Sequence, residues 1–191
     1  MGTSTDLEAA LRALARPGAV VLYPTETLYG LGGLARDSAS ALRIAALKGR
    51  PPGGLIVLHL APPLRQPIAL ALARAFWPGP LTLVVEAWPG LAQEVLGADG
   101  TVAVRPPLHP LAVRLVAAAG PMTSTSANRS GQPPLLDPAS CRLAVDAVVD
   151  GGPLPPRPPS TLVRADDGRV LREGAIPAAR VRAALAAMGL P

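Results

Sequence analysis

The stretch from Ala19 to Gly33, AVVLYPTETLYGLGG, carries the strongest information about the fold. Its first five residues form an apolar run of strand length, and the rest contains two threonines, a glutamate, a tyrosine and three glycines. A short apolar run followed by turn-forming residues is typical of a buried strand, and open α/β sheets bind ligands just beyond strand ends. The stretch predicts a buried strand at 19–23 and a ligand-binding segment at 24–33, although an ordinary turn explains the second half more simply when it is taken alone.

The rest of the chain predicts helices and strands that mix without strict alternation. Helical spacing of apolar residues predicts helices at 7–14, 38–47 (capped by Ser38), 68–76, 91–96, 111–119 and 177–188. Apolar runs predict strands at 55–60, 81–86, 101–105, 147–150, 161–164 and 169–171, the last two joined as a hairpin. The segment GGPLPPRPP at 151–159 is expected to be a stiff connector. This pattern predicts a single α/β domain over residues 1–191, with a twisted sheet of mixed parallel and antiparallel strands.

The composition excludes several classes of protein. Hydrophobic residues make up 49% of the 191 residues and charged residues 16%, which is typical of a globular chain. No apolar run reaches the roughly 18 residues that cross a bilayer, so no membrane contact is expected. The single cysteine, Cys141, cannot form a disulfide within the chain and fits a reducing compartment, which predicts a cytoplasmic protein.

The net charge favours anionic partners. The formal charge is +5 and the sequence pI is about 10.6, which suits nucleotides, RNA or phosphate. The five aromatic residues are not interleaved with arginines, which argues against a base-stacking surface for single-stranded nucleic acid. A surface that recognises duplex RNA by charge and shape stays open.

Lys48 is the only lysine among 18 basic residues, and Asn128 is the only asparagine. Both lie in polar segments, KGRPPGG at 48–54 and TSTSANRSG at 123–131. A compact ammonium can sit between phosphate oxygens as a point charge, which a planar guanidinium cannot do. Chance survival, or a basic residue meeting the dipole of a last helical turn, is the alternative for Lys48. Two lone residues in two polar segments favour a shared binding site.

Other candidate residues divide into binding groups and structural ones. Arg105, at the end of a predicted strand, could clamp a carboxylate with two hydrogen bonds, or form a surface ion pair. The hydroxyl-rich segment at 123–131 could bind a carboxylate, a ribose or a phosphate, or be a solvated loop. His59 is, from its apolar context, more typical of a structural histidine. With two histidines and one cysteine the chain has no zinc spacing, and Cys141 has no partner that would predict a nucleophile.

Taken together, these motifs resemble those of one family, the YrdC-like (TsaC-type) threonylcarbamoyl-AMP synthases in their short, single-domain form. The matching stretches occur in the family's order over residues 18–176 and read YPTETLYGLGG, ALKGRP, FWPGPLTLVV, TVAVRPPLHP, STSANRSGQPP, DGG, PSTLV and VLREGAI. The family's K-x-R…S-x-N signature falls on Lys48, Arg50, Ser126 and Asn128. The chain departs from the family at Gly53-Gly54-Leu55, where relatives usually carry Asn/His-Pro-Leu.

The resemblance implies a twisted α/β sheet with an electropositive concave face. It implies that L-threonine, bicarbonate or CO2, and ATP (with Mg2+) become L-threonylcarbamoyladenylate and pyrophosphate. This product would pass to the proteins that transfer the threonylcarbamoyl group to position 37 of ANN-decoding tRNAs. The alternative from the charge balance is a non-catalytic module that binds structured RNA.

The resemblance also implies roles for individual residues. Threonine would contact Thr25, Thr27, His59, Arg105, Ser124 and Ser160. ATP would contact Lys48, Arg50, Thr101, Ser126, Asn128 and Arg172. Lys48 and Arg50 would be catalytic because they neutralise charge at the α-phosphate and the departing pyrophosphate. No protein nucleophile and no side-chain metal site is expected, so that the phosphates themselves would hold the ion.

Overall fold

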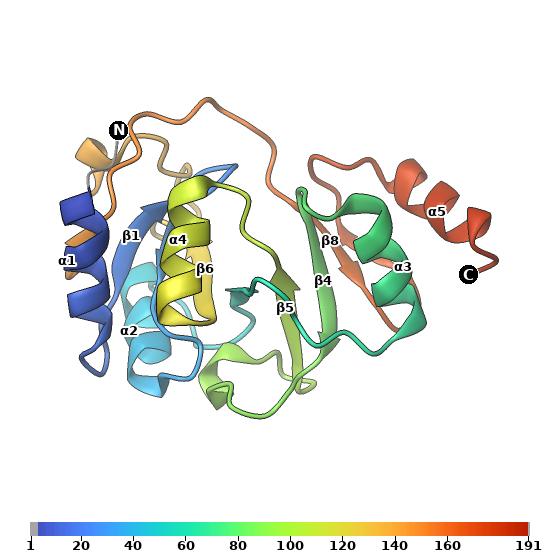
Figure 1. The fold of residues 1–191 in the computed structure, drawn as a ribbon, viewed down its shortest axis with the longest axis horizontal. Coiled ribbons are helices and arrows are strands. Elements are labelled where there is room, and N and C mark those ends of the chain that lie inside the picture. Colours follow the sequence, from blue (N-terminus) through green and yellow to red (C-terminus); the bar gives the residue numbers. More distant parts are fainter. Residues whose placement is uncertain (1–3, 191) are drawn as a thin grey trace.

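The computed structural model describes residues 4–190 and contains one mixed sheet with helices on both faces (Figure 1). The strand order is β7-β1-β2-β6-β3-β5-β4-β8-β9. Their bounds are β1 Val21–Pro24, β2 Tyr29–Gly32, β3 Ile56–Leu58, β4 Leu81–Glu86, β5 Thr101–Arg105, β6 Met122–Ser126, β7 Ala147–Val148, β8 Thr161–Arg164 and β9 Val170–Arg172. The pairs β1–β7, β3–β5 and β4–β8 are parallel and the other neighbours are antiparallel, which confirms the predicted α/β class and mixed sheet.

The helices pack two apolar cores against opposite faces of this sheet. They are α1 Ser4–Leu14, α2 Ser38–Lys48, α3 Pro67–Phe76, α4 Pro110–Ala119 and α5 Ala178–Ala187, with 3-10 turns η1 Gln93–Val95 and η2 Pro138–Ser140. Side chains alternate along β1, so Val20 and Leu22 join the core under α2, α3 and α5, whereas Val21 and Tyr23 join the core under α1 and α4. The sheet is thus buried by different helices on its two faces.

Two strands were not predicted, and both lie in the middle of the sheet. The second half of the opening stretch forms β2, although its glycines suggested a turn. A Cβ at Gly32 would lie 2.0 Å from the Thr123 carbonyl oxygen, and a Cβ at Gly30 would lie 3.0 Å from Ser124 Oγ. These glycines therefore allow β2 and β6 to approach closely within the sheet, which is a strand role that sequence alone does not separate from a turn.

The hydroxyl-rich segment is also a strand in its first part. β6 (MTSTS) pairs with β2 on one side and β3 on the other, so the loop prediction for 123–126 was wrong. Thr123 is fully buried, and its hydroxyl accepts from Gly33 N (3.0 Å) and donates to Gly33 O (3.3 Å). A polar strand is stable at this position because backbone groups satisfy its hydroxyls.

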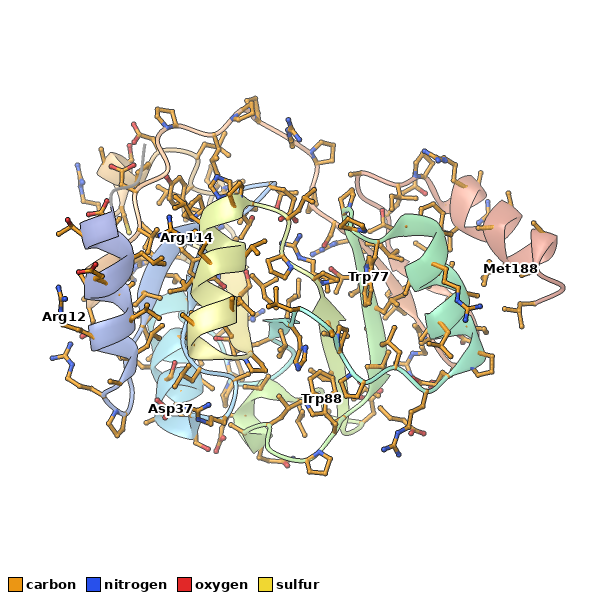
Figure 2. All side chains as sticks on the ribbon, viewed as in Figure 1. Arg12, Asp37, Trp77, Trp88, Arg114 and Met188 are labelled. Atoms are coloured by element: carbon orange, nitrogen blue, oxygen red, sulfur yellow. The ribbon has the colours of Figure 1, made fainter. Side chains whose placement is uncertain are left out.

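Smaller corrections concern element ends. Asp37, labelled in Figure 2, caps α2 by accepting from Ala39 N and Ser40 N (3.0 and 3.3 Å), so Ser38 is the first helical residue and not the cap. The helix predicted at 91–96 is the short 3-10 turn η1, and the strands predicted at 55–60 and 147–150 are shorter than expected. The hairpin of β8 and β9 is confirmed. No helix within residues 4–190 has the length and apolarity to cross a membrane.

Candidate functional site

A cavity of about 530 Å³ opens on the sheet face that α1 and α4 cover in part. Ile56 in β3 and Ser124 in β6 line it. Leu58 and Met122, two residues away on the same strands, pack in the core under α1 and α4. Because residues two apart on a strand share a face, the cavity occupies the part of that face beyond the two helices.

The lining of this cavity is strongly cationic. Its polar members are Thr27, Lys48, Arg50, Arg105, Ser124, Thr125, Ser126, Asn128, Ser130, Arg157, Ser160 and Arg172. Five of them are basic and none is a carboxylate. The volume lies in the range of pockets for small organic ligands, and the charge suits an anionic one.

Lys48 and Asn128, the lone lysine and the lone asparagine, contact each other directly. Lys48 ends α2, and Gly49 follows it in the left-handed conformation (φ 64°) that terminates helices. The Lys48 Nζ donates to Ser126 O (2.6 Å), Asn128 O (2.8 Å) and Asn128 Oδ1 (3.1 Å). An ammonium has three hydrogens, and each has an acceptor here. These contacts confirm the prediction that the two polar segments lie together.

The same contact fixes the loop after β6. The Lys48 carbonyl accepts from Ser130 N (3.0 Å), and the Asn128 side-chain amide donates to the Gln132 carbonyl. Residues 127–132 are therefore held against the end of α2 by both the main chain and the side chain of Lys48. The loop and the helix end form one wall of the cavity.

Burial changes the protonation of Lys48. Its residue is 4% exposed, and desolvation, with the neighbouring charge of Arg50 as a smaller cause, lowers the pKa of the amine to about 8. Desolvation disfavours the charged form and so lowers the pKa of a lysine. The amine is therefore mostly charged at pH 7 but titrates not far above it.

Arg105 forms a buried ion pair with Glu26 at the opposite side of the cavity. The two side chains are 5% and 9% exposed, and Nε of Arg105 has no hydrogen-bond partner within residues 4–190. Burial lowers the pKa of the guanidinium to about 10, which leaves it charged at pH 7. A buried guanidinium with an unsatisfied donor, at the edge of a cavity, is suited to bind a carboxylate.

The start of β8 and the end of β9 form a further wall of the cavity. Ser160 is buried, and its hydroxyl lies 2.7 Å from Thr82 Oγ1 of β4. The Arg172 Nη2 donates to Ser160 O (3.0 Å), and burial lowers the pKa of Arg172. Thr27, which follows Glu26 in the sequence, completes the polar lining, with its hydroxyl 3.2 Å from Thr25 Oγ1. Hydroxyls and guanidinium groups from strands far apart in sequence thus face one space.

Nine of the predicted site residues line this cavity and three do not. Thr25 is buried, and its hydroxyl closes the turn to Leu28 O (2.7 Å). The Thr101 hydroxyl donates to Asp99 Oδ1 (2.6 Å). His59 lies two residues after Val57, which faces the other core, and its ring meets Trp88 edge-on with centroids 5.7 Å apart. Strand alternation therefore turns Leu58, and not His59, toward the cavity side.

The sequence predicted no individual site role for three cavity residues and for one partner, although two of the three lie in the hydroxyl-rich segment 123–131. Arg157 lines the cavity from the proline-rich connector, and Thr125 and Ser130 line it from β6 and the loop beyond. Glu26 was given no role, yet it pairs with Arg105. For Arg157 the available signal was a basic residue set among prolines immediately before the PSTLV motif.

The described residues offer no obvious protein site for a metal. Within residues 4–190 no group of three or more histidine, cysteine, aspartate or glutamate residues lies close enough together to hold an ion. The cavity lining supplies hydroxyls, an amide and cations, which are poor donors for Mg2+ compared with carboxylates. This donor set fits a nucleotide phosphate better than a resident metal.

Comparison with known proteins agrees with this geometry. A family model named Sua5/YciO/YrdC, described as "Telomere recombination", matches residues 13–174. The "Threonylcarbamoyl-AMP synthase" of Thiobacillus denitrificans is 40% identical over 187 residues, which is 90% of this chain and 100% of the relative. The protein of the same name from Bacillus subtilis is 36% identical over 201 residues, covering 97% of this chain and 58% of the relative.

A solved structure shows the same fold with a ligand bound. The crystal structure of P. abyssi Sua5 complexed with L-threonine is 30% identical, with a TM-score of 0.78. The match covers 94% of this chain but 56% of that one, so the chain spans little more than half the length of the P. abyssi and B. subtilis proteins. The family model covers most of the chain, and the relatives exceed 30% identity over nearly all of it. The chain therefore belongs to the Sua5/YciO/YrdC family.

Proposed function

We propose that this protein is a threonylcarbamoyl-AMP synthase, which forms L-threonylcarbamoyladenylate and pyrophosphate from L-threonine, bicarbonate or CO2, and ATP. The observation that carries the proposal is the single cavity lined by five cationic side chains, no carboxylate, and hydroxyls from β6 and the start of β8. Its relatives from T. denitrificans and B. subtilis bear the name of this enzyme, and that of P. abyssi was crystallised with L-threonine.

Threonine would bind at the Arg105 side of the cavity. The guanidinium is buried and has a free Nε donor, so it would take the carboxylate, with Thr27, Ser124 and Ser160 as hydroxyl partners. Glu26 lies against the same guanidinium and keeps its charge paired in the absence of substrate. No cavity contact supports the predicted contacts of Thr25 and His59 with threonine.

ATP would bind toward the Lys48 side. Arg50 has no hydrogen bond or ion pair from its side chain within residues 4–190, and Arg172 faces the same space. Lys48 would support the phosphates while it holds Ser126 and Asn128 in place. Thr101, also predicted to contact ATP, is bonded to Asp99 away from the cavity lining.

The chemistry needs no protein nucleophile. The threonine amine adds to bicarbonate or CO2 to give a carbamate, with loss of water when bicarbonate is the source and release of a proton to solvent when CO2 is. A carbamate oxygen then attacks the α-phosphorus of ATP, the bond to the bridging oxygen breaks, and pyrophosphate leaves with its electron pair. Lys48 and Arg50 would stabilise the charge that develops on the phosphates, and the cavity walls would align the two substrates. Mg2+ would enter with the nucleotide as part of the substrate.

The product is a mixed anhydride that a second reaction has to consume. In the proposed function it supplies the threonylcarbamoyl group for tRNA position 37, through separate transfer proteins. A cytoplasmic location fits this role and the single cysteine.

The test is pyrophosphate release with each substrate omitted in turn. Release should require threonine, bicarbonate and ATP together, and the product should appear as a threonylcarbamoyl adenylate by mass spectrometry. Release that continues unchanged without threonine would contradict the proposal. Arg105→Ala should raise the KM for threonine at least about tenfold, because a charge-assisted pair is lost.

The alternative of a non-catalytic module for structured RNA is not favoured by these relatives. It predicts binding of RNA with steep salt dependence and no dependence of ATP binding on threonine. Calorimetry of ATP binding with and without threonine separates the two functions, because a pure RNA module would show no difference.

A further inference from the structure

The connector between β7 and β8 is an arch fixed at both ends. Figure 1 shows it crossing from the side of α1 to the side of β8. At its start the Tyr29 hydroxyl accepts from Gly151 N and donates to Gly152 O, both at 2.8 Å. At its end Pro159 O accepts from Ala175 N at 2.9 Å. The segment is therefore held at each end.

The end of the arch is also packed tightly. A Cβ at Gly174 would lie 2.2 Å from the Pro159 carbonyl oxygen, so the chain beyond β9 lies directly against it. An intermediate contact, from Leu154 N to Leu136 O (2.8 Å), fixes the first half. Together these contacts set the path of the four residues between Leu154 and Pro159.

Those four residues are Pro155, Pro156, Arg157 and Pro158. Proline fixes φ and lacks an amide hydrogen, so this stretch is stiff without needing main-chain hydrogen bonds. Arg157 is the one residue of the four with a polar side chain, and it lines the cavity. A side chain on a stiff span loses less conformational freedom on binding than the same side chain on a flexible loop.

The side chain of Arg157 has no internal partner. It is exposed and makes no hydrogen bond or ion pair with any residue in 4–190, in contrast to Arg105 and Arg172 of the same cavity. No carboxylate lines the space it faces. A guanidinium with its donors free, in a carboxylate-free cavity, has no structural task and is complementary to phosphate oxygens.

We propose that Arg157 is a further phosphate-binding residue, which contacts the polyphosphate of the nucleotide from the arch opposite Lys48 and Arg50. This inference rests on the proposed function for the identity of the nucleotide. The arch would then be part of the ATP site, although the sequence of the arch suggested only a stiff connector. Arg157 would bind the polyphosphate without touching the amino-acid end at Arg105.

The experiment compares Arg157→Ala with Arg114→Ala. Arg114 is also exposed and makes no side-chain hydrogen bond or ion pair with any residue in 4–190. It projects from α4 (Figure 2) and does not line the cavity, so both variants lose the same charge. Arg157→Ala should weaken binding of ATP, and of pyrophosphate used as a separate probe, by about five- to tenfold, which is typical of a partly exposed charge-assisted contact. The KM for threonine at saturating ATP should not change, and Arg114→Ala should bind like the wild type. Arg157→Lys should recover part of the affinity.

The outcomes separate this inference from the proposed function. If the wild type binds ATP and Arg157→Ala binds it equally well, Arg157 is not a phosphate ligand although the function stands. Equal losses of ATP affinity in Arg157→Ala and Arg114→Ala would show that the effect comes from net charge alone, which would also overturn the inference. If the wild type binds ATP but releases no threonine-dependent pyrophosphate, the proposed function fails while the phosphate contact can still be measured.

Discussion

At the scale of the residue, the ammonium of Lys48 meets three acceptors that converge on one point, Ser126 O and two oxygens of Asn128. An arginine at this position would carry a larger, planar group whose donors diverge in a fork. Lys48→Arg should therefore lower kcat/KM for ATP at least about tenfold, because the loop wall and the phosphate contact are both displaced. Pyrophosphate release measures the loss.

Folding has to be measured beside this activity. The larger side chain enters a buried site, and overpacking of this kind costs about 1–3 kcal/mol, so the variant should keep a native circular dichroism spectrum with a lowered midpoint. Arg114→Lys, an exchange in the opposite direction on α4, is the control and should change neither quantity. Near-normal turnover of Lys48→Arg would remove the special role of the lone lysine.

The lowered pKa of Lys48 predicts a pH dependence of ATP binding. With a pKa of about 8, the amine loses its proton as the pH rises from 7 to 9, while Arg105 stays charged because its pKa is about 10. The terminal phosphate of ATP is already ionised over this interval, since phosphate groups of this type titrate near about pH 6. The Kd for ATP should therefore increase several-fold between pH 7 and pH 9, as measured by calorimetry. Arginine does not titrate in this pH range, so Lys48→Arg should bind ATP more weakly, with a Kd that does not change between pH 7 and pH 9. A wild-type Kd that is equally independent of pH would contradict the role of Lys48 in ATP binding.

At the scale of the element, apolar strands were predictable and polar ones were not. Apolar runs predicted the strands β4, β5 and β8, and the helical spacing of apolar residues predicted α1 and α5, the first and last helices. β2 pairs with β1 and β6, β6 pairs with β2 and β3, and the glycines of β2 make room for the backbone and hydroxyls of β6. β2 alternates the buried Tyr29 and Leu31 with glycines, and β6 has one apolar residue, Met122, so neither has the apolar run of a typical buried strand. Their pairing is a tertiary property. Sequence therefore placed the cavity residues Ser124, Thr125 and Ser126 in a loop, although they lie in the interior strand β6.

In the candidate site too, some residues were predictable from the sequence and others depended on tertiary contacts. The lone Lys48 and Asn128 were predicted to share a site because composition singled them out, and they contact each other. Arg157 was missed because the path of the connector depends on anchors at Tyr29 and Ala175, which lie far away in the sequence. His59 was expected near the substrate, but a strand has a period of two, and the alternation along β3 turns it to the other face.

The close approach of β2 and β6 predicts a large effect of one methyl group. Gly32 does not have a positive φ, so alanine fits its backbone conformation and would stabilise the chain by about 0.4–1 kcal/mol if space allowed. The Cβ would instead meet Thr123 O at 2.0 Å and Tyr23 Cε1 at 2.8 Å. Gly32→Ala should therefore lower the free energy of unfolding by about 3 kcal/mol or more, as seen in urea denaturation.

Gly90 provides the matched control for this prediction. It has a positive φ of 94° with nothing within 4 Å of an added Cβ, so Gly90→Ala isolates the cost of backbone strain, about 1 kcal/mol. A Gly32→Ala protein as stable as Gly90→Ala would show that β2 and β6 can move apart, and that the close approach does not limit the sheet.

At the scale of the whole molecule, the cavity joins elements that lie far apart in the sequence. Its walls come from α2 and β6 at one side and from β5, β8 and β9 at the other, with β3 between them. A ligand that contacts both sides can bind only the folded chain, so binding and folding are linked. ATP and threonine would each add to the stability of the native state, and threonine would do so through Arg105.

Thermal unfolding tests this linkage on the intact protein. A ligand at 100 times its Kd adds about 2.7 kcal/mol, which for a chain of this length corresponds to a Tm increase of roughly 5–10 °C. ATP should raise the Tm, and threonine added with ATP should raise it further. Arg105→Ala should keep the ATP increment and lose the threonine increment, whereas Arg114→Ala should keep both. Because the nucleotide is held by charge, 0.5 M salt should reduce the ATP increment more than the threonine increment, since screening acts more on the half-buried Arg50 and the exposed Arg157 than on the buried Arg105. If Arg105→Ala keeps the full threonine increment, the amino acid binds elsewhere and the cavity is not shared by the two substrates.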